Sequence, residues 1–112
     1  MKKNYYEQKY LQLKKQIEKI GFICNGSVLS VYKTCGNSKC ICHKDKSKRH
    51  GPYNIWTKKI RGKTVTKLLT DEQAILCREC IKNMREIENI LNQMKELSTD
   101  FILDYRKNRE KV

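Results

Sequence analysis

The chain is 112 residues long and carries a formal net charge of +13, from 25 lysines and arginines against 12 aspartates and glutamates. This length predicts one domain with a modest hydrophobic core, which a bound metal ion would help to stabilise. No apolar run approaches the roughly 20 residues that a transmembrane helix needs, and the positive charge argues against a protein that mimics nucleic acid. A polyanion is the natural partner of such a chain.

Residues 1–21 are predicted to form an N-terminal helix, whose regular part spans 4–20. Apolar side chains recur along it at helical spacing, namely Tyr6, Tyr10, Leu13, Ile17 and Ile20, and Gly21 is a stop signal. Because this apolar face is narrow, we expect the helix to pack on another element. The first residues show no apolar signal-peptide core behind their lysines, so we expect a cytoplasmic protein with reduced thiols.

Residues 22–69 are predicted to form a small β-unit. Three stretches rich in β-branched and aromatic residues are its expected strands, at 27–32, 53–60 and 64–69. Arg61-Gly62-Lys63 lies between the second and third strands as a tight turn, so these two strands should form a β-hairpin. The predicted fold class is therefore α+β, with this three-stranded unit between two helices.

Three cysteines and a histidine gather inside this β-unit, as Cys35-Gly-Asn-Ser-Lys-Cys40-Ile-Cys42 and then His50-Gly-Pro-Tyr. A Cys₃His set can close a tetrahedral shell around one Zn²⁺ ion. Cys40 and Cys42 are too close in sequence for an easy mutual disulfide, and their thiolates would repel unless a cation held them. In a chain without an export signal, such clustering favours a zinc knuckle over a disulfide framework.

Most of the positive charge lies in the middle of the chain. Between Lys33 and Lys67, eleven lysines and arginines stand against one acid, Asp45, so this segment carries +10 of the +13. Aromatic residues lie among these charges, an arrangement that can supply base stacking and phosphate contacts. The predicted nucleic-acid-binding residues are Lys44, Lys46, Lys48, Arg49, Trp56, Lys58, Lys59, Arg61 and Lys63. The alternative is that the basic loop over 43–51 is solvated surface, and that at least one aromatic residue belongs to the sheet core.

Residues 70–112 are predicted to form a long C-terminal helix. Thr70 and Gln73 make a capping box at its start. Apolar side chains then recur every seven residues from Cys77 to Tyr105, as in a coiled-coil seam or the face of a helical hairpin. Self-association and docking on another protein both stay open. Ser98-Thr99-Asp100 is also an N-cap signal, which could break the helix near 98–100.

Three further cysteines need an interpretation. Cys77 and Cys80 have CxxC spacing but lie on the apolar stripe of the predicted helix, so burial in the core is favoured for them, as it is for Cys24. A second metal site that joins these three thiols, with His43 as a further ligand, stays open. A thioredoxin-like redox role is disfavoured, because no βαβ pattern accompanies the motif.

Gly26-Ser27-Val28 leads into a strand, Cys35-Gly36-x₃-Cys40-x-Cys42 follows, and His50-Gly51-Pro52-Tyr53 precedes an aromatic strand. This combination resembles a family of small uncharacterised bacterial and archaeal proteins, over about residues 26–95. The resemblance implies that Cys35, Cys40, Cys42 and His50 are metal ligands, and it suggests mobile-element or phage neighbourhoods without supplying an activity. The family usually has proline near the Cys-Gly pair, where Asn37 or Ser38 stands here, and it usually lacks Cys77 and Cys80.

An enzyme is disfavoured, because the Cys-rich shell would leave no open metal position and His43 and Asp45 are the only groups nearby that could act as a base. The sequence therefore predicts a zinc-stabilised accessory protein that binds DNA or RNA, associated with a mobile element or phage. The alternative is an adaptor whose C-terminal helix docks on a larger recombinase, transposase or nuclease.

Overall fold

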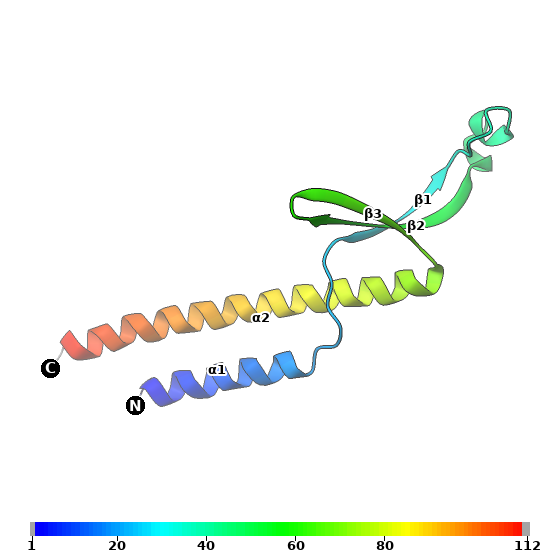
Figure 1. Cartoon of the computed structure of the whole chain (residues 1–112). Helices are drawn as coiled ribbons and strands as arrows, with labels where there is room; N and C mark the ends of the chain where they lie inside the picture. Colours follow the sequence, from blue (N-terminus) through cyan, green and yellow to red (C-terminus); the bar gives the residue numbers. More distant parts are fainter. Residues whose placement is uncertain (1, 111–112) are drawn as a thin grey trace. The chain divides into compact units, whose positions relative to one another are not determined.

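The computed structural model describes residues 2–110, and over this range it has the α+β arrangement that the sequence predicts (Figure 1). The elements are α1 (Lys2–Glu18), β1 (Ser27–Lys33), the short 3₁₀ turns η1 (Ile41–His43) and η2 (Lys46–Lys48), β2 (His50–Ile60), β3 (Lys63–Leu69) and α2 (Asp71–Glu110). The chain divides into two compact units. The helical unit holds α1 and the part of α2 from Asn83 onward, and the β-unit spans residues 23–82.

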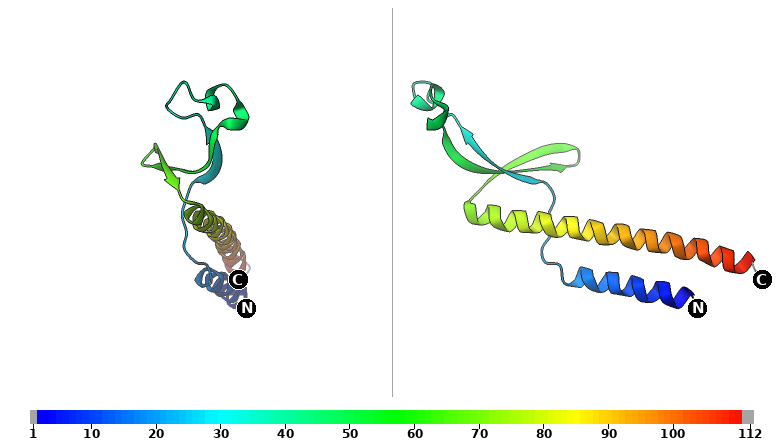
Figure 2. Two further views of the ribbon diagram at one scale, coloured as in Figure 1. Left: turned by 90° about the vertical axis from the view of Figure 1, so that its right-hand side faces the viewer. Right: turned by 180° about the vertical axis from the view of Figure 1, so that it is seen from behind.

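In the helical unit, α1 runs antiparallel to α2 (Figure 2). The five apolar positions that the sequence assigns to its packed face are all half-buried. At one end, the Tyr6 ring packs on the Phe101 ring with a centroid separation of 5.6 Å, and the Tyr6 hydroxyl donates to the Asp104 carboxylate. At the other end, the Asn83 side-chain amide donates to the Phe22 carbonyl at 2.9 Å. These contacts fix the register of the helix pair.

Helix α2 is continuous through Ser98-Thr99-Asp100, so the break considered at 98–100 does not occur. The Thr99 hydroxyl donates to the Lys95 carbonyl, one turn earlier at 3.0 Å, instead of capping a new helix. A threonine hydroxyl can be satisfied in this way without ending the helix. The capping box at the other end is confirmed, with Thr70 and Gln73 exchanging hydrogen bonds of 2.9 and 3.1 Å.

Only part of the seven-residue apolar pattern is buried. Ile90 and Met94 are buried in the helical unit, whereas Leu91, Ile102 and Tyr105 are exposed. None of the helices in the described part of the chain combines the length and hydrophobicity needed to cross a bilayer.

The sheet of the β-unit is antiparallel, with the strand order β1-β2-β3. Ile60 pairs with Lys63, so the β2–β3 turn consists of Arg61 and Gly62, which have φ values of 51° and 80°. Positive φ at both central residues is typical of the type I′ turn, whose twist matches that of the hairpin. Strand β2 begins three residues earlier than the sequence predicts, because His50 pairs with Lys33 of β1.

One face of the sheet packs against the start of α2. The buried Asn54 side chain accepts a hydrogen bond from the Ser30 hydroxyl at 3.2 Å and donates one to the Asp71 carboxylate at 2.7 Å. Trp56 lies on the same face, since side chains alternate along a strand, and its indole N–H donates to the Asn25 carbonyl at 2.9 Å. A Cβ on Gly26 would lie 2.7 Å from that indole nitrogen, so glycine is required there.

The opposite face of the sheet is open. Leu29, Ile55 and Leu68 are cross-strand neighbours on it. Leu29 and Leu68 are 61% and 64% exposed. Ile55, which lies between them, is half-buried. Exposed apolar side chains on both outer strands of this face suggest a contact surface.

The Tyr6–Asp104 hydrogen bond should make the helical unit sensitive to alkali. This bond raises the pKa of Tyr6 to about 12, from an ordinary value of about 10. The stabilisation should therefore be complete below about pH 10 and be lost as the pH rises through about 12. Urea unfolding of the wild type and of Tyr6→Phe should show a difference in unfolding free energy that shrinks over this interval. Tyr32→Phe, which removes an exposed hydroxyl of the β-unit, is the control, and a difference that does not change with pH would contradict this prediction.

Candidate metal centre and basic surface

The four predicted ligands converge in the segment that joins β1 to β2. This segment lies at the end of the strand pair (Figure 1). Cys35 follows β1, Cys40 and Cys42 lie at η1, and His50 opens β2. Their ligand atoms all lie within 4.8 Å of one another. The loop between β1 and β2, residues 34–49, is called the knuckle loop below. Its residues meet because the two strands hold both ends of the loop together.

The distances inside the cluster are short. The Cys35 and Cys42 sulfur atoms are 3.6 Å apart, and the Cys40 sulfur lies 3.6 Å from Nε2 of His50. Cys42 is 1% exposed, whereas His50 is exposed. All six cysteines are free thiols. The four side chains can therefore hold a metal ion, with Cys42 on the inner side of the site.

Local electrostatics favour negative charge on one of these sulfur atoms. The backbone N–H of Cys42 hydrogen-bonds the Cys40 sulfur and, with further hydrogen bonds from His50 and the neighbouring thiols, lowers the pKa of Cys40 to about 6. Burial raises the pKa of the Cys42 thiol. The backbone N–H of Cys35 donates to the Cys42 sulfur at 3.3 Å. Such N–H contacts orient sulfur ligands in metal sites.

The remaining polar groups of the knuckle loop support its backbone. His43 bonds the Cys35 carbonyl through Nε2 at 2.8 Å, so it points to the knuckle and not to Cys24, Cys77 or Cys80. The Asp45 carboxylate accepts hydrogen bonds from the Ser47 hydroxyl and backbone N–H, at 2.7 and 3.0 Å, which lower its pKa. Asn37 forms a turn, because its side-chain oxygen accepts from Lys39 N–H and its carbonyl accepts from Cys40 N–H. The sequence did not assign this role to Asn37, although asparagine favours such turns.

The basic side chains surround this centre and the β2–β3 hairpin. The β-unit holds 13 lysines and arginines against four acids, a net charge of +9 for residues 23–82. None of the basic side chains from Lys33 to Lys67 forms an ion pair with a carboxylate of residues 3–105, the range over which side chains are described. The predicted nucleic-acid-binding residues that are exposed are Lys44, Lys46, Lys48, Arg49, Lys59, Arg61 and Lys63.

Two of the predicted nucleic-acid-binding residues, Trp56 and Lys58, are only half-exposed. Trp56 is half-buried on the face of the sheet that meets α2, and the Lys58 ammonium lies 4.1 Å from the centre of its ring. The aromatic residue that does face the open side of the sheet is Tyr53, which is 37% exposed. It pairs with Val31 and lies two residues from Ile55, on the same face.

A family model described as a domain of unknown function, DUF6788, matches residues 4–76. The chain belongs to this family. The matched segment contains all four knuckle ligands and the whole sheet, and it ends immediately before Cys77. No curated protein and no solved structure matches the chain significantly. Family membership therefore leaves the function of the knuckle open.

Removing a knuckle ligand should cost the chain one metal ion. Cys42→Ser should lose that ion and unfold residues 34–49, because metal binding and folding of such loops are coupled, and His50→Ala should weaken binding. Native mass spectrometry of wild type and variants gives the stoichiometry. His43→Ala is the matched control, since it removes an imidazole of the same loop that is not a ligand. Full metal content in Cys42→Ser would show that the four residues do not form the site.

Proposed function

We propose that this protein is a zinc-stabilised, non-catalytic accessory protein that binds DNA or RNA in the cytoplasm, in the service of a mobile element or phage. The observation that carries the proposal is the net charge of +9 on the β-unit, whose basic side chains are mostly exposed and lack acidic partners within the described residues. Clustered, unneutralised cations are the electrostatic footprint of a phosphate-binding surface.

Zinc is the metal that suits the knuckle best. A tetrahedral Zn²⁺ ion with ordinary bond lengths places two sulfur ligands about 3.8 Å apart, and a sulfur and an imidazole nitrogen about 3.5 Å apart. The corresponding separations here are 3.6 Å for Cys35–Cys42 and 3.6 Å for Cys40–His50. Four protein ligands fill such a shell, which favours a structural role over a catalytic one.

The metal would give the basic loop a fixed shape. Lys44, Lys46, Lys48 and Arg49 lie between the third and fourth ligands, and η2 in this stretch is capped by Asp45. Fixing the loop at both ends lowers the conformational entropy that its backbone loses when the loop binds phosphates. We therefore assign the knuckle loop to backbone contacts, which position a nucleic acid without reading its sequence.

The open face of the sheet is the favoured place for contacts with bases. A groove of about 370 Å³ lies on it, lined by Lys33, Tyr53, Ile55, Thr66 and Leu68. An aromatic ring with an apolar floor can stack an unpaired base, and an adjacent ammonium group can bind the neighbouring phosphate. This arrangement favours single-stranded nucleic acid, and in it Tyr53 takes the stacking role that the sequence assigned to Trp56.

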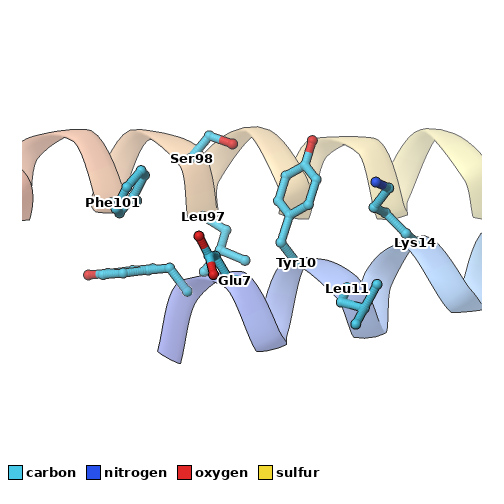
Figure 3. Close-up of a pocket in the computed structure, with 8 residues that line it drawn as sticks. Glu7, Tyr10, Leu11, Lys14, Leu97, Ser98 and Phe101 are labelled. Atoms are coloured by element: carbon cyan, nitrogen blue, oxygen red, sulfur yellow. The ribbon is translucent and has the colours of Figure 1, made fainter. Parts of the chain in front are cut away.

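A second candidate function has its own support in the helical unit. Ile102, Leu103 and Tyr105 of α2 are 63%, 54% and 53% exposed. A neighbouring cavity of about 260 Å³ between α1 and α2 is lined by Tyr6, Glu7, Tyr10, Leu11, Lys14, Leu97, Ser98 and Phe101 (Figure 3). Such a surface suits an adaptor that receives an amphipathic helix of a larger nucleic-acid enzyme, such as a recombinase, transposase or nuclease. The two functions are compatible, because they use different units.

Nucleic-acid binding should fall steeply with salt, as counterions are released from phosphates. Reversing Lys46, Lys48 and Arg49 to glutamate should weaken binding to all sequences alike. It should reduce the slope of log affinity against log salt by about two for single strands, if each residue contacts one phosphate. Fluorescence anisotropy with labelled single-stranded and duplex oligonucleotides at several salt concentrations measures both effects.

The matched control reverses Lys15, Arg85 and Lys95, three exposed cations of the helical unit. It changes the net charge by the same amount and should affect binding much less. Tyr53→Ala should reduce affinity for single strands about 10-fold, the loss of one stacked base, with a smaller effect on duplexes. Equal losses from the two triple reversals would mean that net charge alone attracts the polyanion. No detectable binding near physiological salt would favour the adaptor.

The adaptor function predicts that exposed apolar residues of α2 are dispensable for folding. Ile102→Asp should leave the unfolding free energy within about 0.5 kcal/mol of wild type, as surface substitutions do, while Ile90→Asp should destabilise the helical unit because Ile90 is buried. Circular dichroism during urea unfolding measures this, and light scattering over a concentration series gives the oligomeric state. A wild-type dimer that Ile102→Asp dissociates would identify the surface as a homo-oligomer contact. A clear loss of stability in Ile102→Asp would contradict the exposed placement.

A further inference from the structure

The three cysteines outside the knuckle meet in the β-unit. Cys24 lies in the segment that precedes β1, and Cys77 and Cys80 lie about one turn apart on α2. The Cys24 backbone N–H donates to the Cys80 carbonyl at 3.3 Å, and the Cys24 thiol contacts the Cys77 carbonyl at 3.7 Å. These contacts hold the Cys24 segment against the first turns of α2 and bring thiols together that are more than 50 residues apart in sequence.

The spacing of two of the thiols is that of metal ligands. The Cys24 and Cys77 sulfur atoms are 3.8 Å apart, close to the sulfur–sulfur separation of about 3.8 Å around a tetrahedral zinc ion. The third thiol belongs to the next turn of the same helix. Cys80 lies three residues after Cys77 on α2, and it lines the same cavity as Cys24 and Cys77. Cys24 is thus within reach of both helical cysteines. Packing of a hydrophobic core alone would not require the Cys24 and Cys77 sulfur atoms to lie side by side.

The surroundings of the cluster suit a soft cation. A cavity of about 270 Å³ adjoins the sulfur atoms, lined by Cys24, Trp56, Leu69, Gln73, Leu76, Cys77 and Cys80. The lining contains no carboxylate, so a cation that prefers oxygen ligands would find little there. The Lys58 ammonium, which lies over the Trp56 ring, is close enough to act on the charge of Cys24.

We propose that Cys24, Cys77 and Cys80 form a second metal site, which binds a thiophilic d¹⁰ ion such as Zn²⁺ or Cu⁺ through three thiolates. Binding releases three thiol protons to solvent and forms three metal–sulfur bonds without oxidation or reduction. With a divalent ion the centre carries one net negative charge, which Lys58 partly offsets. Three thiolates leave the fourth position of a tetrahedral zinc ion open to an external ligand. In this respect the centre differs from the closed Cys₃His knuckle.

The site would be a feature of this chain beyond the segment matched by the family model. That segment ends at residue 76, so two of the three ligands lie outside it. A metal here would cross-link the segment before β1 to the start of α2. It would thus join the first and last parts of the β-unit, whereas the knuckle lies in the loop between β1 and β2. The proposal does not depend on nucleic-acid binding.

Metal stoichiometry tests the second site. The reduced full-length protein, loaded with Zn²⁺ and freed of excess ion, should carry two zinc ions by native mass spectrometry. Cys24→Ala, Cys77→Ala and Cys80→Ala should each carry one, Cys42→Ser should carry one, and Cys24→Ala combined with Cys42→Ser should carry none. One ion in the wild type that only knuckle variants remove would overturn the proposal.

A second measurement uses the wild type alone, in case the buried alanine variants fail to fold. Titration of the metal-free reduced protein with Co²⁺ should raise the thiolate-to-metal charge-transfer absorbance until two equivalents are bound, because both centres contain three thiolates. Saturation at one equivalent would overturn the proposal. That result could come with a Cys24–Cys77 disulfide in mildly oxidised protein, mapped by peptide mass spectrometry. Cys24 and Cys77 would then be a redox-sensitive pair, and Cys80 would have no part in it.

Discussion

The convergence of three thiols and an imidazole at the end of the β1–β2 pair is the constraint on which the β-unit depends. Residues 34–49 contain two short 3₁₀ turns and only one buried side chain, that of Cys42. A loop of this length with so little apolar burial has no hydrophobic reason to keep one shape. Ligation of four side chains would supply that reason, because metal-binding free energy becomes folding free energy when the site forms only in the folded loop.

The two faces of the sheet have different roles, because one packs on α2 and the other is open to a ligand. On one face, the buried Asn54 amide links Ser30 of β1 to Asp71 at the start of α2, and Trp56 is held by its hydrogen bond to Asn25. The other face keeps the exposed side chains of Leu29 and Leu68 beside basic residues. A small sheet with one packed face can present its second face to a ligand without losing its core. The groove beside Tyr53 is the consequence that matters for the proposed function.

Charge and apolar surface are also divided between the two units. The β-unit carries most of the net positive charge, whereas the helical unit has 12 basic and eight acidic residues and exposes apolar side chains along α2. Positive charge attracts a polyanion over a long range, while exposed apolar side chains gain free energy only on close packing. One chain could thus hold a nucleic acid and a protein partner on separate surfaces.

The sequence by itself determined the elements and the knuckle. Helical spacing from Tyr6 to Ile20, the Thr70–Gln73 capping box and the β-branched stretches predict local structure, because they depend on neighbours in the chain. The four knuckle ligands lie within 16 residues and were equally visible. The continuity of α2 is a local outcome, because the Thr99 hydroxyl bonds the Lys95 carbonyl one turn earlier in the same helix. Tertiary structure alone decided that α1 packs on this part of α2, through Tyr6 and Phe101. It also decided that Trp56 meets α2 while Tyr53 faces outward, and that Cys24 joins Cys77 and His43 does not. Each of these outcomes depends on which distant elements pack together, and a pattern of neighbouring residues contains no information about that choice.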